Sequence, residues 1–414
     1  MKSSSKTTKQ YINLYFQVHQ PRRLNKFRFF DIGSDAPYFN DALNESIMKR
    51  IALECYLPAN KMLLRIIKKN PKVRITFSIS GVALEQLHDY APEVLKTFRM
   101  LAATGAVEFL GETYYHSLSS LNQPQEFVAQ TKKHHQKIQD LLGVEPAIFR
   151  NTELVYSNVI GEAVNAMGFR GMYTEGIESL LKKKPVNKTY SLPGTNFVLF
   201  LRNYKLSDDI AFRFSDRKWS QWPLTSDKFI TWLKGIPREQ DFISIGMDYE
   251  TFGEHHKSRS GIFRFLEQLI TAVARSTRFR FMNPTEAAKR LKQNGKLSIE
   301  KTISWADQAK DISAWLGNDL QRDAFDSMLK LYPAVMNSLD MKLINAYNHL
   351  QTSDHFYYMS TKKNEDGSVH QYFSPYSSPY EAYMNYMNVL ADLEMKTTTH
   401  KENRSSDSMW VSSL

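Results

Sequence analysis

The chain has almost no cysteine and no long apolar run. Its one cysteine, Cys55, excludes an intramolecular disulfide and a cluster of metal-bound thiolates, and it is typical of a protein from a reducing compartment. No run reaches the roughly 18 apolar residues that a membrane-spanning helix needs. The basic N-terminus MKSSSKTTKQ is not followed by the apolar segment of a signal peptide. We therefore expect a cytoplasmic protein with no membrane segment.

The charge is positive but not concentrated. There are 54 Lys and Arg against 43 Asp and Glu, a net charge of +11. Basic residues are spread along the chain with only short clusters such as Lys182–Lys183–Lys184, which favours a solvated surface over a nucleic-acid site. Aromatic residues make up 13%, consistent with platforms that stack on sugars or bases, although most aromatics serve the core. The composition leaves the oligomeric state open.

Seven β-rich segments alternate with helical patterns. The predicted strands cover residues 11–20, 73–80, 107–115, 147–154, 169–176, 196–203 and 241–247. This alternation predicts a parallel sheet wound by right-handed crossovers. Seven units favour closure into a β/α barrel. An open doubly wound sheet is the alternative, but no glycine-rich fingerprint follows the first strand.

The fold class is therefore α/β, a seven-stranded parallel β/α barrel with a C-terminal helical region. The spacing is helical almost throughout residues 311–349, and no internal repeat is present. The predicted domains are a disordered N-terminus over 1–10, a barrel over 11–295, a helical region over 296–395 packed on the barrel, and a disordered tail over 396–414.

The stretch ISIGMDYETFGEHH at 243–256 begins as a buried strand and ends in ionisable residues. Asp248 and Glu250 are two positions apart on an extended chain and point to the same side. Parallel barrels present their chemistry at such carboxyl ends of strands. A solvated acidic loop is the alternative, but Glu153 ends another predicted strand. His19, His116, Glu175 and Asn203 also lie at or just past strand ends.

Two carboxyl groups in unlike surroundings can cleave an acetal. One protonates the leaving oxygen while the other attacks or stabilises the anomeric carbon. Arg150 precedes Glu153 by three positions, and its charge would favour an ionised nucleophile. Asp248 follows an apolar strand, where desolvation would favour the protonated acid. The pair would suit acetal cleavage, but two acids at strand ends 95 residues apart do not identify that chemistry by themselves.

The motifs resemble those of glycoside hydrolase family 57, the retaining α-amylase and 4-α-glucanotransferase family, over nearly the full length. Five blocks can be read in order: His19–Gln20–Pro21, Gly105–Ala106–Val107–Glu108, Arg150–Asn151–Thr152–Glu153, Met247–Asp248–Tyr249–Glu250–Thr251–Phe252–Gly253, and Gln351–Thr352–Ser353–Asp354 with Phe356–Tyr357–Tyr358. The runs at 304–307, 314–318 and 206–214 resemble the amylase branch of the family.

The resemblance implies a seven-stranded barrel and double displacement on α-1,4-glucan, with Glu153 as nucleophile and Asp248 as general acid/base. Their carboxyl groups would lie roughly 5–5.5 Å apart, as retention requires. Hydrolysis and glucan transfer would use the same two acids, so the choice between them stays open. Some members have Trp three residues before the nucleophile, where this chain has Arg150.

The resemblance also implies substrate-binding residues. His19 would hydrogen-bond a glucosyl hydroxyl. Glu108 would either touch sugar or orient its neighbours, and Trp305 would stack on a glucose ring or pack in the core. Further candidates at the rim of the site are His116, Glu250, His255 and Asp354.

No cofactor and no metal are expected. His134 and His135 are adjacent on a predicted helix and point about 100° apart, which is unsuited to holding one ion. The alternatives to a glucan-cleaving enzyme are a metal-dependent sugar deacetylase, a non-catalytic glucan-binding barrel and a basic nucleic-acid binder. The last of these would bind in a strongly salt-dependent way.

Overall fold

The computed structural model describes the backbone of residues 9–411 and the side chains through Thr399. The chain forms two compact units built from interleaved segments. Unit 1 comprises the chain up to Gln20 with Ser46–Tyr114 and Gln123–Trp305, and unit 2 comprises Pro21–Glu45, Tyr115–Asn122 and the chain from Ala306 on. The sequence pattern predicts a single boundary between the barrel and the helical region, at 295–296, because a pattern read along the chain does not detect segments that belong to a unit formed elsewhere in the sequence.

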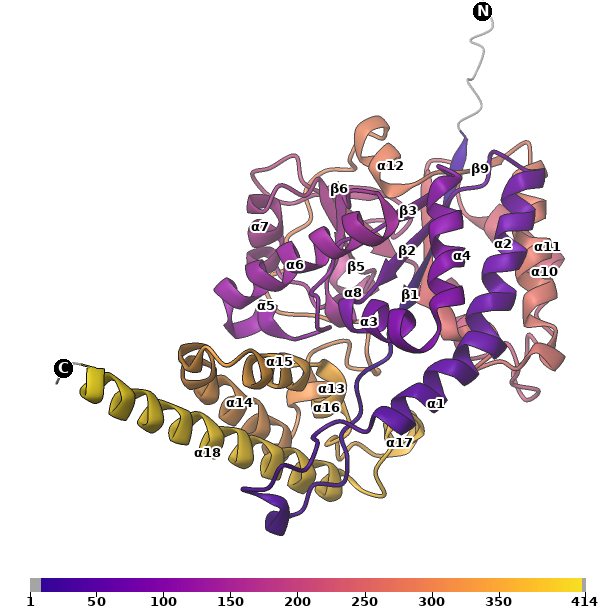
Figure 1. Cartoon of the computed structure of the whole chain (residues 1–414). Coiled ribbons are helices and arrows are strands. Elements are labelled where there is room, and N and C mark those ends of the chain that lie inside the picture. The colour runs from indigo at the N-terminus through magenta and orange to yellow at the C-terminus, as the bar shows by residue number, and fades with distance from the viewer. Residues whose placement is uncertain (1–8, 412–414) are drawn as a thin grey trace, which may run out of the picture. The chain divides into compact units, whose positions relative to one another are not determined.

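Unit 1 contains a parallel sheet with strands in the order β3-β2-β1-β8-β7-β5-β4. The strands are β1 Gln10–Val18, β2 Ile75–Ile79, β3 Val107–Phe109, β4 Ile148–Arg150, β5 Gly171–Glu175, β7 Val198–Arg202 and β8 Phe242–Asp248. Just past β3, Gly111 bonds to β4: its N–H donates to the Ile148 carbonyl at 2.9 Å, and its carbonyl accepts from the Arg150 N–H at 2.8 Å. This bridge joins the two ends of the order, so the predicted seven-stranded β/α barrel is confirmed (Figure 1).

Two short strands were not predicted. β6 (Thr189–Ser191) pairs antiparallel with β7, in a segment that reads as an extended loop, and β9 (Phe279–Phe281) pairs parallel with β1. Each is only three residues long, so neither repeats a side-chain period often enough to be recognised.

The strands alternate between an apolar outer face and a more polar interior. Ile243, Ile245 and Met247 of β8 belong to the core that the surrounding helices cover. Gly246 faces the interior, where a Cβ atom would lie 2.0 Å from the Tyr15 ring, so only glycine leaves room for that ring. The interior also holds an apolar cluster around Tyr15, Tyr173 and Phe200.

Helices cover the outside of the sheet in unit 1. α2 packs on α4 and α11, α10 packs on α11, and α4 packs on α6 (Figure 1). A π-helical turn, η2 (Ala52–Tyr56), joins α1 to α2 just before Pro58. The helices are α1 Asp41–Ile51, α2 Leu57–Lys69, α3 Gly81–Tyr90, α4 Pro92–Ala103, α6 Pro124–Leu142, α7 Asn158–Ala166, α8 Glu178–Leu181, α9 Tyr204–Ala211, α10 Ser226–Gly235, α11 Ile262–Arg275 and α12 Pro284–Arg290.

Unit 2 is helical. α14 packs along α18, and α15 contacts both. The buried Trp315, Phe325, Tyr347, Phe356 and Tyr386 form much of its core. The helices are α5 Ser119–Asn122, α13 Ser313–Leu316, α14 Asp319–Ser338, α15 Met341–Leu350, α16 Ser353–Tyr357, α17 Asn364–Phe373 and α18 Pro379–Val411. The loop before α1 is tied to α18, since the Gly33 N–H donates to Asp392 at 2.6 Å.

The last helix differs from the prediction. α18 continues to Val411, so a disordered tail beginning at 396 is wrong for residues 396–411. No glycine or proline interrupts the sequence after Pro379, and polar composition alone does not stop a helix. Residues 412–414 and the first eight residues of the predicted N-terminal tail lie outside the described residues, while Gln10 begins β1.

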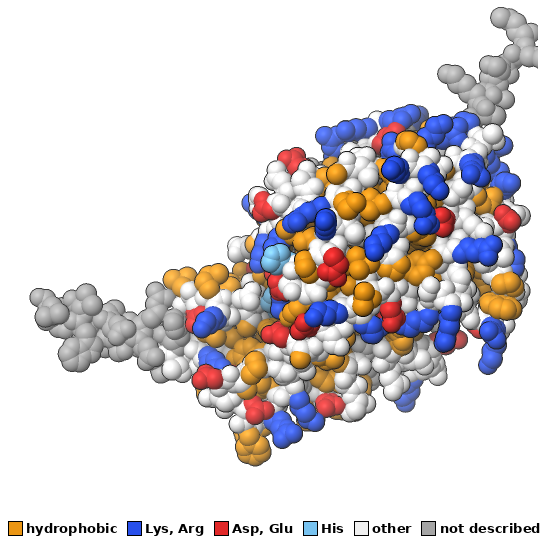
Figure 2. Space-filling model, turned by 45° about the vertical axis from the view of Figure 1, so that its right-hand side comes forward, with side chains coloured by type: hydrophobic (Ala, Val, Ile, Leu, Met, Phe, Trp, Pro, Cys, Tyr) orange, Lys and Arg blue, Asp and Glu red, His pale blue; other side chains and the backbone are white. Residues whose placement is uncertain are grey.

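The surface is basic in scattered places. On the face drawn in Figure 2, Lys and Arg side chains are spread widely over the surface among apolar and acidic ones. Within residues 9–411, no helix is both long enough and apolar enough to span a membrane. The cytoplasmic location stays a prediction.

Candidate active site

Asp248 is the last residue of β8, at the carboxyl end of the strand. It lies opposite Gln17 of β1 in the strand register. Immediately after it, η4 (Tyr249–Thr251) turns the chain and buries Glu250. The extended chain ends at Asp248, and Glu250 lies in the turn that follows, so the predicted alternation of the two side chains along one strand does not extend to Glu250.

Glu153 lies in a strained turn after β4. Its φ is 57° and that of Leu154 is 53°, both in the left-handed region that side chains other than glycine rarely adopt. The turn is held from two sides: the Thr152 and Thr113 hydroxyls are 2.6 Å apart, and the Asn151 side-chain amide donates to the Val155 carbonyl at 2.8 Å. Strain of this kind persists where the surroundings impose it, often at functional sites.

Trp305 contacts the Glu153 carboxylate. Its indole Nε1–H donates to Glu153 Oε2 at 2.7 Å. The Arg150 guanidinium lies 4.6 Å from the Trp305 ring centroid, and that of Arg202 lies 5.3 Å from it. An aromatic ring therefore stands beside Glu153 although position 150 is arginine, and it comes from a segment 152 residues away.

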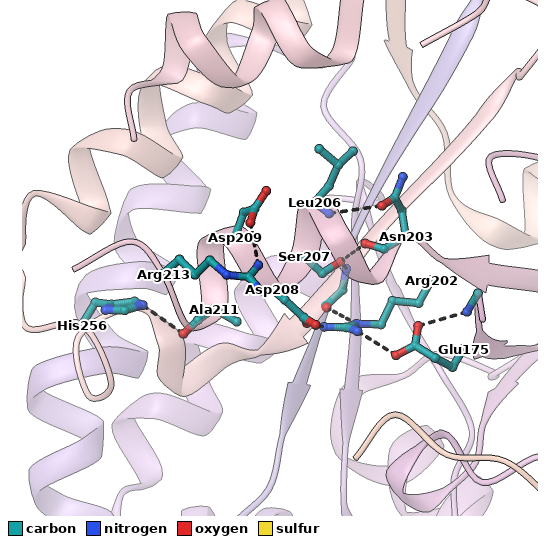
Figure 3. A network of polar contacts seen from close by, with 12 residues as sticks. Glu175, Arg202, Asn203, Leu206, Ser207, Asp208, Asp209, Ala211, Arg213 and His256 are labelled. Carbon is teal, nitrogen blue, oxygen red and sulfur yellow. Dashed lines mark hydrogen bonds and ion pairs between the residues drawn. The ribbon is translucent and has the colours of Figure 1, made fainter. Parts of the chain in front are cut away.

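Arg202 is held in a buried ion cluster (Figure 3). It donates to Glu175 at 2.8 Å, to Asp208 at 2.5 Å and to the Gly246 carbonyl at 2.7 Å. Asp208 arrives from α9, which begins at the N-cap residue Asn203. The cluster ties β5, β7 and β8 together at their carboxyl ends.

Charged side chains from several strands influence the buried Tyr15 hydroxyl. Burial raises the pKa of Tyr15 well above its usual range; Arg202 and Arg150 oppose the rise, and Glu175 and Asp248 add to it. Groups at the ends of β4, β5, β7 and β8 thus act on one buried point. The geometry agrees for two of these groups, since the guanidinium groups of Arg150 and Arg202 both lie within 5.3 Å of one ring centroid, that of Trp305.

Glu250 is buried against two polar groups. Its Oε1 accepts a hydrogen bond from the Tyr56 phenol and another from the Gln20 amide at 3.4 Å. Burial, and then the nearby Asp248, raise the pKa of Glu250 to about 8. Glu250 is therefore mostly protonated at neutral pH.

His19 also lies at this edge. Its Nδ1 is 2.6 Å from the Ser80 hydroxyl, which caps α3 by accepting from the Ala83 N–H. His255 follows η4, and burial lowers its pKa to about 4, so it is neutral at physiological pH. Whether either residue touches a sugar stays a prediction.

Glu108 accepts hydrogen bonds from Thr285. Its carboxylate accepts from the Thr285 hydroxyl at 2.7 Å and from the Thr285 N–H at 3.2 Å, at the N-terminus of α12. Burial raises its pKa to about 7, and the bonds from Thr285 oppose the rise. A carboxylate at a helix N-terminus is favourable, so these contacts stabilise the start of α12, and the role of Glu108 toward a sugar stays a prediction.

Glu112 was not predicted, although it follows β3 as Glu153 follows β4. It is fully buried and accepts from the Gln17 side-chain amide at 3.1 Å. Gln17 is in turn the register partner of Asp248. The pattern VEFLGET at 107–113 contains a second acidic residue after the strand, and that acid could have been weighed beside Glu108.

The histidine pairs do not form a metal site. His134 is buried; its Nε2 bonds to the Ile79 carbonyl at 2.8 Å and its Nδ1 accepts from the Glu112 N–H at 3.3 Å. His256 bonds through Nε2 to the Ala211 carbonyl at 2.9 Å (Figure 3). Across the described part of the chain, no group of three His, Cys, Asp or Glu side chains is arranged to hold an ion.

Two further candidates belong to unit 2. The Ser353 N–H donates to the His116 carbonyl at 2.9 Å, and the Thr352 hydroxyl donates to the Tyr115 carbonyl at 2.9 Å. Asp354 is the second residue of α16. The segments that carry His116 and Asp354 thus lie side by side, and His116 has a left-handed φ of 51°.

Comparison with known proteins agrees with this arrangement. Residues 13–300 match the sequence profile of glycosyl hydrolase family 57. A Methanocaldococcus jannaschii protein named "Putative alpha-amylase" is 40% identical over 419 residues, covering 96% of this chain and 88% of that protein.

Solved structures share the fold at low identity. A branching enzyme of this family from Thermococcus kodakaraensis has a TM-score of 0.68 at 13% identity, over 88% of this chain and 87% of that one. A 4-alpha-glucanotransferase from Thermococcus litoralis has a TM-score of 0.63 at 14% identity, over 84% of this chain and 56% of that one. With the profile match and the 40% identical relative, these findings mean that the chain belongs to glycosyl hydrolase family 57, a family of enzymes that act on glycosidic bonds.

Proposed function

We propose that this enzyme is a retaining glycosidase of the α-amylase type that acts on α-1,4-glucan such as starch, glycogen or maltodextrin. The assignment to this activity draws on the name of the 40% identical Methanocaldococcus jannaschii relative. The observation that carries the mechanism is the held carboxylate of Glu153 after β4, in the same compact unit in which β8 ends at Asp248.

In the first step Glu153 attacks the anomeric carbon, and the bond from that carbon to the leaving glucosyl oxygen breaks. Asp248 gives its proton to the leaving oxygen. In the second step Asp248 takes a proton from water, and the water oxygen displaces Glu153. Retention by this route needs the two carboxyl groups roughly 5–5.5 Å apart.

Asp248 has to be protonated in the first step and ionised in the second. The neutral Glu250 beside it keeps a second full charge away from Asp248 at neutral pH. His19 and His255 are proposed to bind sugar hydroxyl groups, and the same role is proposed for His116 and Asp354 of unit 2. Trp305 is better explained by its bond to Glu153 than by stacking on a sugar.

The test uses the full-length protein with maltoheptaose. We expect Glu153→Gln and Asp248→Asn each to reduce turnover by at least about a thousandfold, because each removes one reacting group. The first product released by the wild type should be the α-anomer by NMR. Unchanged turnover in Glu153→Gln, or a β-anomer, would overturn the mechanism.

Glucan transfer is the second candidate, since the same two acids would serve a sugar hydroxyl in place of water. The structural similarity to a 4-alpha-glucanotransferase is a similarity of fold only. Incubation with maltotriose separates the two activities. Products longer than maltotriose mean transfer, and only shorter products mean hydrolysis.

A further inference from the structure

We propose that Trp305 is the positioning residue that orients the Glu153 carboxylate for attack, and that Arg150 and Arg202 hold its indole in place. This rests on the proposed role of Glu153 as nucleophile. It assigns to Trp305 a function different from the sugar stacking that its residue type suggests.

The backbone brings Trp305 to Glu153 in a fixed register. The Tyr156 N–H donates to the Ile303 carbonyl at 2.9 Å, and the Ile303 N–H donates back to Tyr156 at 2.9 Å. Two residues further along this antiparallel pairing, the Trp305 N–H donates to the Glu153 carbonyl at 3.2 Å. Trp305 therefore binds Glu153 through both its main chain and its indole, which leaves the carboxylate little rotational freedom.

The indole is itself held by two cations. The guanidinium groups of Arg150 and Arg202 lie within 5.3 Å of the ring centroid, and a cation over an indole ring is attracted to it. Arg202 cannot easily leave, because Glu175, Asp208 and the Gly246 carbonyl fix it. The ring is thus anchored to the rigid ends of β4 and β7.

Burying Arg150 beside the Trp305 ring costs folding free energy. Arg150 is 0% exposed, and its Nε and Nη2 have no hydrogen-bond acceptor among the described residues. Burying unpaired donors of a charged group costs free energy that a contact with one aromatic ring returns only in part. An apolar residue would pack against the ring at lower cost, so a charge beside the Glu153 site is better explained by function than by stability.

The hydrogen bond from the Trp305 indole gives the two oxygens of the Glu153 carboxylate different roles. Oε2 accepts from the indole, and we assign the bond to the anomeric carbon to Oε1. In the covalent intermediate Oε2 becomes the ester carbonyl oxygen, still facing the indole N–H. Because orientation of a reacting group contributes strongly to rate, losing this bond should lower the rate of the chemical step more than substrate binding.

The kinetic test compares Trp305→Phe with the wild type on maltoheptaose. Phenylalanine keeps an aromatic ring beside the two arginines but removes the N–H. We expect kcat to fall about 10- to 100-fold, as for loss of a hydrogen bond to a charged group, with KM changed less than about threefold. Trp219→Phe is the matched control, since Trp219 packs against Trp232 in the same unit and should leave kcat unchanged. A large rise in KM at unchanged kcat would mean sugar stacking and overturn the proposal.

A second measurement needs no substrate. The chain has six tryptophans, so a protein labelled with ¹⁵N-tryptophan should show six indole N–H resonances, and Trp305→Phe identifies one of them. We expect the chemical shift of that resonance to differ between the wild type and Glu153→Gln, because the acceptor of the indole N–H changes from a carboxylate to an amide. An indole resonance with the same chemical shift in both folded proteins overturns the proposal.

The proposed function and the positioning role of Trp305 can be refuted by different results. If Glu153→Gln keeps full turnover of maltoheptaose, Glu153 is not the nucleophile, whatever the indole resonance does. If Glu153→Gln is inactive but Trp305→Phe matches the wild type in kcat, the nucleophile stands and the role of Trp305 is refuted.

Discussion

The phenol of Tyr56 donates a hydrogen bond to the carboxyl group of Glu250, and both side chains are buried. Asp248 lies two residues before Glu250, and its charge helps to raise the pKa of Glu250 to about 8. At neutral pH, Glu250 therefore keeps its proton next to the proposed acid/base. This pairing has a consequence for stability that can be measured without substrate.

The free energy of unfolding should decrease as pH rises from about 5 to 8 because of Glu250. Its pKa is about 8 in the folded protein and 4.5 for an unperturbed glutamate, so in this window the folded state binds the extra proton. Glu250→Gln cannot ionise, and it should flatten this part of the pH dependence by up to a few kcal/mol. Urea unfolding of the wild type and of Glu250→Gln at pH 5 and pH 8 measures this change in the free energy of unfolding. An equal difference between the proteins at both pH values would contradict the prediction.

The buried ion cluster in Figure 3 should be sensitive to loss of its cation. Arg202→Met removes the cation that pairs with the buried Glu175, and we expect a loss of about 3–5 kcal/mol in the free energy of unfolding. Adding Glu175→Gln should recover part of that loss. Arg213→Ala breaks the more exposed pair with Asp209 in the same view, and it should cost less than about 1 kcal/mol. Equal losses in urea unfolding for Arg202→Met and Arg213→Ala would rule out the difference in burial as the cause.

Glycine at 246 should be required for the fold of the barrel interior. Gly246→Ala would bring a methyl group within 2.0 Å of the Tyr15 ring, and the ring is packed on Tyr173 with centroids 4.4 Å apart. We expect a loss of about 1–3 kcal/mol or more from overpacking. Gly235→Ala is the control, because no other group lies within 4 Å of the place that its new methyl group would take. Thermal unfolding of the two variants should differ clearly, and similar melting temperatures would refute the steric argument.

The bond from Thr285 to Glu108 should stabilise the protein more strongly at high pH. The pKa of Glu108 is about 7, so its carboxyl group is mostly ionised at pH 8 and mostly neutral at pH 6. Thr285→Val removes the hydroxyl donor, and we expect a loss of about 1 kcal/mol at pH 6 and up to about twice that at pH 8. Thr231→Val, which removes an exposed hydroxyl bond to the Asp227 carbonyl, should show no such pH dependence. A loss for Thr285→Val that is the same at both pH values would count against a charged Glu108.

Local pattern was enough to predict the barrel strands. Each of the seven is buried, and residues such as Ile243, Ile245 and Met247 repeat with the period of a strand. The short strands β6 and β9 have no such repeat. The contact of Gly111 with β4 joins the ends of the strand order through two hydrogen bonds, and no local property of a glycine predicts its partner.

The candidate site likewise has residues that the sequence predicted and contacts that it did not. Polar residues at strand ends, such as Glu153 and Asp248, could be predicted because the apolar pattern of a strand stops where the chain leaves the sheet. For Glu108 the sequence left two roles open, contact with sugar or orientation of its neighbours, and only the structure shows that its carboxylate bonds to Thr285 at the N-terminus of α12. Glu112, a few residues later, was passed over because two acids near one strand end cannot be ranked without knowing which way each side chain points.

The sequence by itself determined the order of strands along the chain, the acids that end two of them and the family to which they belong, because these depend on near neighbours and on motif identity. Only the tertiary structure decided that the indole of Trp305 meets the Glu153 carboxylate, with Arg150 and Arg202 beside the ring. The physical reason is that such a contact depends on the register between segments far apart in sequence and on the space left between packed strands, and neither is written in a local pattern.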